Sequence, residues 1–488
     1  MKMDLGYYCF PPEIWYIIVQ LLSREDQRRM LFVSKPLHDC ALSLLFSRVT
    51  IRFGLWVPDC NRPGPLYDNM DEEGELERQH NVSWEVLRRI SRDPSFAQLV
   101  KVVSVRAFMG EGDTVFQLRA LTDALESLPH LRAFYWDGMG PCINTHVVQV
   151  LATASSATLA ELSVPIARGI STFLPLFENL QSLSLGARPL QHSMDDMYFE
   201  DRDVVEMQHC FETIPSALRR LWVYGNAIWD APVGIFDRLQ ELCLFFPATL
   251  NGLGLVLHHC LDLRSFGLLL ADIGTASSLR AAILEAPDSL PNVTSFKLIG
   301  DFLSQNYNVA LPLVDFLRRK TQLRRLDLGF QSDGSNDRPF PILNPISSLP
   351  RVESLERLDS ELPLGLTALL LHLDFAYSDD GIQQGLIDMI KKRNKLRYLH
   401  ILDTGVIFDL KQQLLEDHPP SLELAGYGPY LRWLEKDPES GNPAYSTPWG
   451  WDQVVFRGVG DFGCEDWEWL LRGHGWWTLD NLAPGTMS

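Results

Sequence analysis

The chain has 488 residues, 46% of them hydrophobic, which is enough apolar material for a large folded core and for about two to four domains. Its formal net charge of −19 argues against a nucleic-acid-binding body, which would need a basic surface. Its eight cysteines include no C-x-x-C pair, and no apolar run reaches the ~20 residues of a membrane helix, so we expect reduced thiols, a cytoplasmic or nuclear location and no membrane partner.

The first predicted elements are three short helices between Phe10 and Phe46. Pro11 and Pro12 suit a first helical turn, and the apolar residues that follow at helical spacing are Ile14, Ile17, Ile18, Leu21 and Leu22. Ser23 and Asp26 are spaced like a capping box, and Ser34 with Pro36 can start a third helix. So small a module buries little of its own surface, and a partner is expected to cover the rest.

These residues resemble the F-box family. The residues in step with the family pattern are Phe10, Pro11, Glu13, Ile14, Ile18, Leu22, Asp26, Val33, Ser34 and Lys35, and they cover roughly a tenth of the chain. Gln27 departs from the pattern, since a leucine is usual there, and the departure could weaken docking.

F-box modules dock on the Skp adaptor of cullin-based SCF ubiquitin ligases, so the resemblance implies an adaptor role. It implies that a Skp adaptor and, through it, a cullin scaffold are partners. The predicted adaptor-binding residues are Pro11, Pro12, Ile14, Ile18, Leu22, Val33 and Leu37. The alternative is an amphipathic three-helix cap on the next domain.

A strand-like run follows from Arg48 to Val57, and then an acidic loop rich in proline and glycine extends to about His80. The acids that make this loop self-repelling are Asp68, Asp71, Glu72, Glu73, Glu75 and Glu77, which predicts a mobile, solvated insertion. We therefore assign residues 1–50 to the F-box and residues 51–95 to a linker.

Residues 96–430 repeat the unit L-x-x-L-x-L or a close variant, each copy preceded by an amphipathic stretch. The ten copies begin at Leu131, Leu159, Leu180, Leu218, Leu239, Leu263, Val293, Leu323, Leu366 and Leu396, with weaker copies at Val100 and Leu422. The last two apolar positions of a copy are two apart and face the same side of a strand, while the intervening stretches are helical. The predicted fold class is therefore α/β, a curved leucine-rich-repeat solenoid with a parallel sheet on its concave face. The combination resembles the F-box/LRR proteins of fungi.

In such repeats the variable strand positions face the concave surface and nominate substrate contacts. They are Tyr135, Asp137, Trp222, Tyr224, Asn226, Lys297, Asp327 and His400. Trp222 and Tyr224 alternate with Leu221 and Val223 and form an outward aromatic pair typical of interface anchors. An equally good interpretation is that these residues pack against an insertion or the C-terminal tail.

The segment 431–488 holds seven of the thirteen tryptophans, namely Trp433, Trp449, Trp451, Trp467, Trp469, Trp476 and Trp477. Bulky aromatic residues suit a cap over the open core of a last repeat, and an aromatic ligand-binding surface is the alternative.

Three motifs suggest chemistry that the rest of the sequence does not support. Gly458, Gly460 and Gly463 have dinucleotide-binding spacing, but too few residues follow them to complete that fold. Two groups of metal-ligand residues, His209 with Cys210 and His258 to Cys260, lack a second pair at zinc spacing. Two basic clusters, Arg318 to Lys320 and Lys391 to Arg393, fall where helix ends are predicted and would complement the helix dipole. No cofactor, metal ion or catalytic residue is expected.

The leading hypothesis is a non-enzymatic substrate receptor, in which the F-box holds the adaptor and the repeats bind an unknown protein substrate. An interaction scaffold acting outside ubiquitination is the second hypothesis. An enzyme that uses the C-terminal glycine motif is the third.

Overall fold

The computed structural model describes residues 10–55, 72–109, 115–185, 201–270, 275–300, 307–329, 359, 362–373, 380–403, 408–450 and 453–454, apart from residues 23, 142, 167, 225–226, 428–429 and 438. The chain forms two compact units. Unit 1 comprises Met1–Leu55, Met70–Ser182 and Pro215–Ala217, and unit 2 comprises Trp56–Asn69, Leu183–Ile214 and Leu218–Ser488. Fifteen strands are described, and their order in the sheet is their order in the chain.

Unit 1 begins with the three predicted helices, α1 (Pro12–Gln20), α2 (Arg24–Met30) and α3 (Lys35–Phe46). Pro11 is the N-cap residue of α1 and Ser34 that of α3, as the turn residues predict, whereas Ser23 lies outside the described residues. The helical prediction for this module is therefore confirmed, while its assignment as an F-box is a separate question.

Strands and helices alternate in the rest of unit 1. The elements are β1 (Arg48–Gly54), α4 (Glu72–Arg92), α5 (Pro94–Ala97), β2 (Val102–Phe108), α6 (Val115–Leu125), β3 (Ala133–Gly140), α7 (Thr145–Ser155) and β4 (Glu161–Val164), then short 3₁₀ turns at Ile170–Thr172 and Leu174–Leu176. Strands β1 to β4 pair in parallel. Two of these helices, α5 and α7, start at side-chain caps: Asp93 accepts from the amides of Ser95 and Phe96, and Asn144 from that of Val147.

The prediction of a mobile acidic linker is wrong from Glu72 onward, because this stretch is the first long helix of the repeats. The Glu75 carboxylate accepts hydrogen bonds from Arg78 and Gln79, one helical turn away, which offsets the repulsion among its acids. Leu87 and Ile90 of the same helix are buried. The sheet also begins before residue 96, where the repeats were predicted to start. Strand β1, which spans the assigned boundary at residue 50, already pairs with β2.

Unit 2 continues the alternation, and β5 (Ser182–Leu185) straddles the boundary between the units. Its elements are α8 (Asp201–Thr213), β6 (Arg220–Tyr224), a 3₁₀ turn (Ala227–Asp230), α9 (Val233–Phe236), β7 (Glu241–Phe245), α10 (Leu253–His259), β8 (Ser265–Leu270), α11 (Thr275–Glu285), β9 (Ser295–Gly300), α12 (Tyr307–Arg318), β10 (Arg325–Gly329), β11 (Ala368–Leu373), α14 (Asp380–Lys391), β12 (Tyr398–Asp403), α15 (Phe408–Glu416), β13 (Leu424–Tyr427), β14 (Tyr430–Lys436) and β15 (Pro443–Tyr445).

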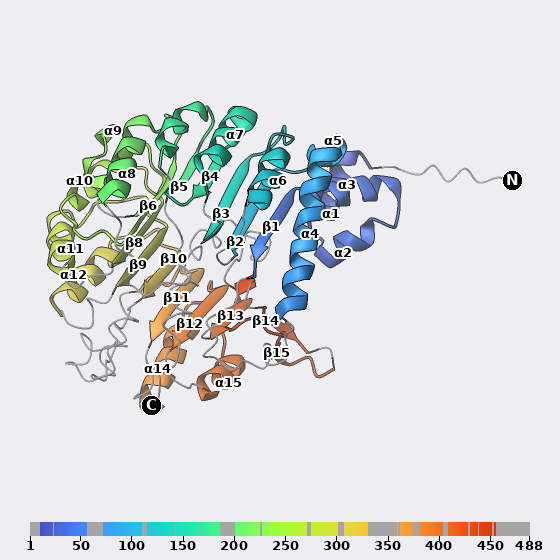
Figure 1. Ribbon diagram of the computed structural model, residues 1–488. Coiled ribbons are helices and arrows are strands. Elements are labelled where there is room, and N and C mark those ends of the chain that lie inside the picture. The colour runs from blue at the N-terminus through green and yellow to red at the C-terminus, as the bar shows by residue number, and fades with distance from the viewer. Residues whose placement is uncertain are drawn as a thin grey trace. The chain divides into compact units, whose positions relative to one another are not determined.

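Strands β6 to β13 pair in parallel, and each predicted L-x-x-L-x-L copy ends in one of the observed strands. Figure 1 shows the helices along one side of the strands within each unit. Leu326 and Leu328, the last two leucines of one copy, are buried as predicted. The repeats thus have leucine-rich-repeat architecture, a mixed α/β arrangement of stacked strand–helix pairs. The curvature of the whole solenoid stays a prediction, since the two units are described separately.

The residue three places before the first leucine of a copy is buried in many repeats. Its carbonyl accepts a hydrogen bond from that leucine, as Phe236 does from Leu239 and Cys260 from Leu263. At this position Lys320 and Arg393, which follow the ends of α12 and α14, are also buried.

The two cations reach back to the preceding repeat. The Lys320 ammonium donates to the carbonyls of Pro287 and Ser289. Arg393 donates to the Asp359 carboxylate at 2.9 Å and to the Leu362 carbonyl at 3.1 Å. These two side chains therefore tie adjacent repeats together, in addition to the helix-end position that the sequence predicted for their clusters.

The last described strands of unit 2 form an antiparallel hairpin instead of another parallel repeat. Strand β14 pairs antiparallel with β13, and β15 pairs antiparallel with β14. Leu431 is buried there, and the rings of Trp433 and Trp449 lie 5.8 Å apart. Strand β14 thus lies beside β13, the strand of the last repeat, which is where the tail was expected to form a cap. Trp451 and the four later tryptophans lie outside the described residues.

Candidate protein-interaction surfaces

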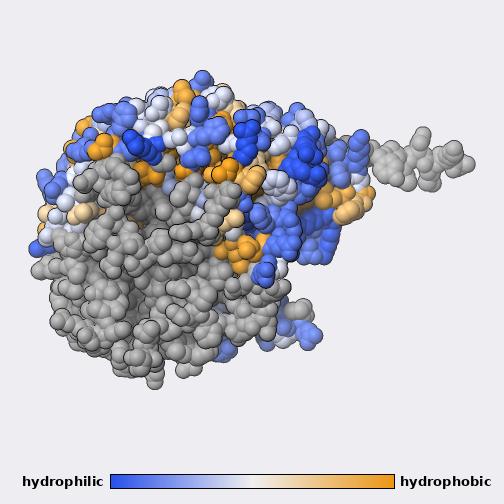
Figure 2. Space-filling model, in the orientation of Figure 1, coloured by the Kyte–Doolittle hydropathy of each residue, from blue (hydrophilic) through white to orange (hydrophobic). Residues whose placement is uncertain are grey.

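The helical module exposes an apolar stripe along α1. Its members are spaced i, i+3, i+4 and i+7 on one side of the helix and are Ile14, Ile17, Ile18 and Leu21. Leu21 is 82% exposed, and the turn between α2 and α3 adds Phe32, 89% exposed, and Val33. We call these six residues the apolar stripe. Figure 2 shows hydrophobic residues reaching the surface among hydrophilic ones in this part of unit 1.

The stripe is exposed because the module packs through its other side. Val19 of α1 and Ala41 of α3 are fully buried, and α1 and α2 both pack on α3. Complete burial of an isoleucine, leucine or phenylalanine contributes about 1.5–3 kcal/mol relative to exposure. Six such side chains in one module therefore provide a strong driving force for association with a protein.

The seven predicted adaptor-binding residues lie at the surface or near it. Ile14, Ile18 and Val33 belong to the stripe, Pro11 and Pro12 are exposed at the start of α1, and Leu22 and Leu37 are half-buried. The predicted adaptor-binding residues did not include Ile17, Leu21 and Phe32, although the helical spacing of Ile17 and Leu21 had been recognised.

Gln27, the departure from the family pattern, is not part of the stripe. Its amide nitrogen donates to the carbonyls of Val19 and Leu22, each at 3.2 Å, where α1 ends. The side chain thus links α2 to the end of α1, where the Val19 carbonyl also accepts from the Leu22 amide. His38 plays a similar part for α2, since its Nδ1 donates to the Leu31 carbonyl at 2.8 Å. Gln27 therefore positions α1 and its stripe from inside the module.

The module is joined tightly to the first repeats of unit 1. A single residue, Ser47, separates α3 from β1, and its carbonyl accepts from the amides of Lys101 and Val102. The rings of Phe46 and Phe96 lie 5.2 Å apart, and the Arg89 guanidinium lies 4.4 Å from the centroid of the Phe96 ring. A partner bound to the stripe would therefore have a fixed orientation relative to β1 and β2.

The second candidate surface is the strand face that carries the predicted substrate contacts. In unit 2 one row runs in register across the strands and comprises Trp222, Cys243, Gly267, Lys297, Asp327, Leu370, His400 and Gly426. Every side chain of this row for which burial is described is buried. The row is tightly packed, since a Cβ at Gly267 would lie 2.6 Å from the Cys243 sulfur.

The polar groups of the row are held in pairs. The Lys297 ammonium lies 3.6 Å from the Asp327 carboxylate on the neighbouring strand, with side-chain exposures of 4% and 0%. The Tyr398 hydroxyl and His400 Nδ1 are 2.8 Å apart. Burial raises the pKa of the Cys243 thiol to about 12, so it is a neutral packing group.

The remaining predicted contacts are divided between the units. In unit 1, Tyr135 is half-buried and donates to the Glu161 carboxylate, and Asp137 is buried. Tyr224 lies on β6, opposite Phe245, and Asn226 lies outside the described residues. The described conformation gives a partner no access to Lys297, Asp327 or His400, and substrate binding by these eight residues stays a prediction.

The residues considered as metal ligands have other contacts. His209 lies 3.1 Å from the Glu212 carboxylate, His259 lies 3.4 Å from that of Asp237, and His258 donates to the Gly254 carbonyl. The thiols of Cys210 and Cys260 are buried, which raises the pKa of each to about 12. In the described part of the chain no group of three potential ligands could hold a metal ion. Gly458, Gly460 and Gly463 lie outside it.

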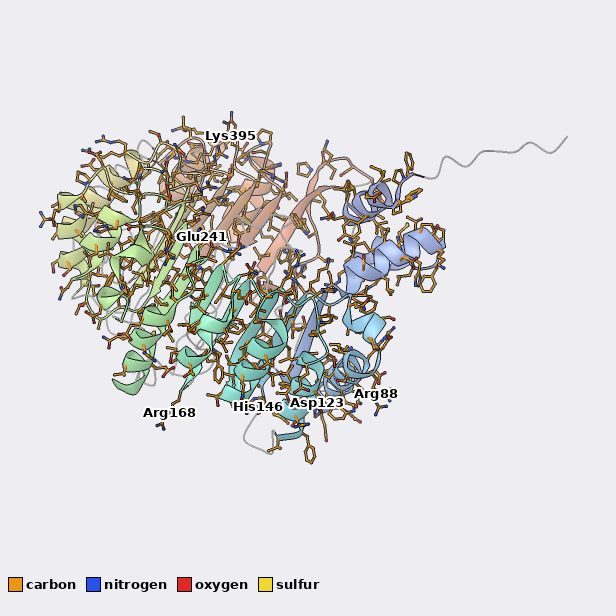
Figure 3. All side chains as sticks on the ribbon, turned by 90° about the horizontal axis from the view of Figure 1, so that it is seen from above. Arg88, Asp123, His146, Arg168, Glu241 and Lys395 are labelled. Carbon is orange, nitrogen blue, oxygen red and sulfur yellow. The ribbon has the colours of Figure 1, made fainter. Side chains whose placement is uncertain are left out.

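Charged side chains in the helices of unit 1 lie outside the sheet. Figure 3 shows Arg88 and Asp123 pointing away from the strands, and it places Glu241 among the strands of unit 2.

No helix in the described ranges is both long enough and apolar enough to cross a membrane.

Comparisons with known proteins yield only distant structural likenesses. No protein-family model matches the sequence, and no curated protein is significantly similar to it. Among solved structures, the leucine-rich repeat-containing protein LegL7 from Legionella pneumophila is similar over 64% of this chain and 97% of its own, with 15% identity and a TM-score of 0.38. A protein from Bacteroides fragilis is similar over 69% of this chain and 70% of its own, with 14% identity and a TM-score of 0.25. Both scores are too low to carry an argument about fold or function.

Proposed function

We propose that this protein is a non-enzymatic substrate-recognition subunit of a cullin-based SCF ubiquitin ligase. In this proposal α1 to α3 form an F-box that docks on the Skp adaptor, and the repeats bind the protein to be modified. Catalysis would consist of proximity, since the receptor would hold a substrate lysine near the thioester of another subunit.

The observation that carries the proposal is the apolar stripe, six exposed side chains on a module whose sequence follows the F-box pattern. A protein interface buries about 800 Å² on each partner around an apolar centre, and the stripe supplies such a centre. The direct connection through Ser47 and Phe46 supports the proposal, because it fixes the module on the first repeats of unit 1.

The test is adaptor binding by a variant with three charges in the stripe, Ile14→Glu, Ile18→Glu and Val33→Glu. Isothermal calorimetry with the purified Skp adaptor should show tight binding by the wild-type chain and at least a hundredfold loss in the variant. A control variant also introduces three glutamates, at exposed leucines of unit 2, and should bind like wild type. These leucines are Leu261, Leu284 and Leu364. Undiminished binding by the stripe variant would show that the module is no F-box.

The second hypothesis is an interaction scaffold that acts outside ubiquitination. It also has the F-box bound to the adaptor, but without a cullin in the complex. Affinity purification of the tagged full chain from cells should recover both adaptor and cullin if the leading proposal holds. Recovery of the adaptor alone would favour the scaffold.

A further inference from the structure

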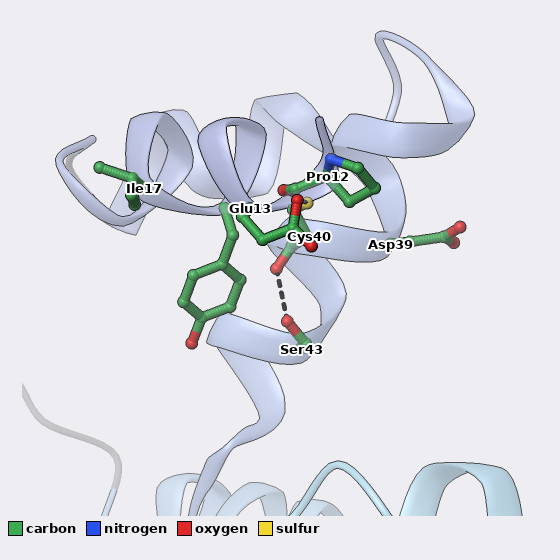
Figure 4. A pocket seen from close by; sticks show the side chains of 7 residues that line it. Pro12, Glu13, Ile17, Asp39, Cys40 and Ser43 are labelled. Atoms are coloured by element: carbon green, nitrogen blue, oxygen red, sulfur yellow. Dashed lines mark hydrogen bonds between the residues drawn. The ribbon is translucent and has the colours of Figure 1, made fainter. Parts of the chain in front are cut away.

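A pocket of about 490 Å³ opens between α1 and α3, beside the apolar stripe. Its walls come from Pro12, Tyr16 and Ile17 of α1, and Ile17 also belongs to the stripe (Figure 4). The pocket is thus continuous with the surface on which the partner is proposed to dock.

Two further lining residues, Cys40 and Ser43 of α3, are uncharged. Burial, and secondarily the neighbouring Asp39 carboxylate, raises the pKa of the Cys40 thiol, which therefore stays protonated. The Ser43 hydroxyl donates to the Cys40 carbonyl at 2.8 Å, so its proton is already engaged (Figure 4). These two groups can therefore lie against the aliphatic part of an incoming side chain.

Two carboxylates, of Glu13 and Asp39, stand at the pocket and are exposed to solvent. On α2, by contrast, Glu25 and Asp26 both contact Arg29, at 2.6 and 2.8 Å. Glu13 and Asp39 form no ion pair within the described part of the chain. Two carboxylates without a cation, above an apolar pocket with a tyrosine ring in its wall, complement a basic side chain.

We propose that this pocket receives an arginine or lysine side chain of the protein that docks on the apolar stripe. The aliphatic stem lies against Pro12, Tyr16 and Ile17, and the cationic end meets Glu13 and Asp39. This inference rests on the proposed function for the position of the partner, and it adds an electrostatic anchor that fixes the partner's register on α1.

The test compares the double variant Glu13→Gln, Asp39→Asn with wild type, using the purified Skp adaptor as the probe at 50 and 300 mM salt. Loss of two charge-assisted contacts should weaken binding about tenfold at low salt and flatten the salt dependence. Glu126→Gln with Glu178→Gln removes the same charge from exposed carboxylates elsewhere in unit 1 and should change affinity less than twofold.

The outcomes separate the two ideas. If the stripe variant loses binding while the pocket variant keeps the affinity and salt dependence of wild type, the pocket inference is overturned and the proposed function stands. If the Glu126 and Glu178 control weakens binding as much as the pocket variant, the effect is one of net charge and the inference also falls. If the wild-type chain does not bind the adaptor, the proposed function fails, and the inference fails with it.

Discussion

The helical module and the repeats bury their apolar residues in opposite ways. In the repeats, leucines such as Leu326 and Leu399 are fully buried because each strand–helix pair lies against its neighbours. In the module, α1 buries Val19 and leaves Ile14, Ile17, Ile18 and Leu21 at the surface. The repeats therefore complete their core within the chain, whereas the module leaves apolar side chains exposed. Substitutions should accordingly act on stability in the first region and on binding in the second.

The largest expected effect is at Arg393, whose side chain is fully buried between repeats. Arg393→Met removes the cation from Asp359 and from the carbonyls it ties, and should lower the free energy of unfolding by about 3–5 kcal/mol. Urea denaturation measures the loss. Lys395→Met, two residues away and exposed, should change stability by no more than about 0.5 kcal/mol. Equal effects would mean that Arg393 does not join the repeats.

A matched pair of truncations compares the two regions directly. Leu326→Ala leaves a cavity in the core and should cost about 2–4 kcal/mol. Ile17→Ala removes a half-exposed side chain and should cost less than about 1 kcal/mol while weakening adaptor binding. Thermal unfolding and calorimetry give the two readouts. A large stability loss at Ile17 would show that the module uses its stripe internally.

Asp359 supplies a pH test of the same repeat contact. Burial alone would raise its pKa, but hydrogen bonds from Lys392 and Arg393 outweigh burial and hold the pKa below its ordinary value. Its stabilising effect is therefore complete above the unfolded pKa of about 4 and is lost as pH falls through the lower folded pKa. Asp359→Asn should cost about 1.5–3 kcal/mol at pH 7 and progressively less below pH 4 in denaturation experiments. A difference independent of pH would refute the ion pair.

The smallest expected effect is at Gln27. Gln27→Leu restores the residue usual in the F-box pattern but removes two hydrogen bonds at the end of α1, so it should cost about 1 kcal/mol. Adaptor affinity should fall only slightly, because the side chain lies outside the stripe. Tighter binding by the leucine variant would instead mean that Gln27 weakens the docking face.

The sequence predicted the repeats well because their signal is local. The two alternating leucines of each copy mark a strand, and all ten copies, with the weaker ones at Val100 and Leu422, lead into observed strands. Helix α4 was missed because the acids around Glu75 suggested repulsion, whereas Arg78, one turn away, pairs with Glu75 and reduces it. The antiparallel return at β14 has no repeat signal and depends on tertiary pairing with β13.

The candidate surfaces were less predictable than the fold. Spacing identified the row containing Lys297 and His400, but burial depends on the whole chain and cannot be inferred from alternation alone. The Glu13 and Asp39 pocket could not be foreseen either, because it requires α1 and α3 to lie side by side.

The most direct test of the central claim is hydrogen exchange on the full chain with and without the Skp adaptor. The account predicts that added adaptor protects α1 (Pro12–Gln20) and the turn at Phe32 and Val33, with little change in strands β6 to β12. Saturating adaptor that leaves α1 and this turn unprotected would contradict the claim that the module exposes its apolar residues for this partner.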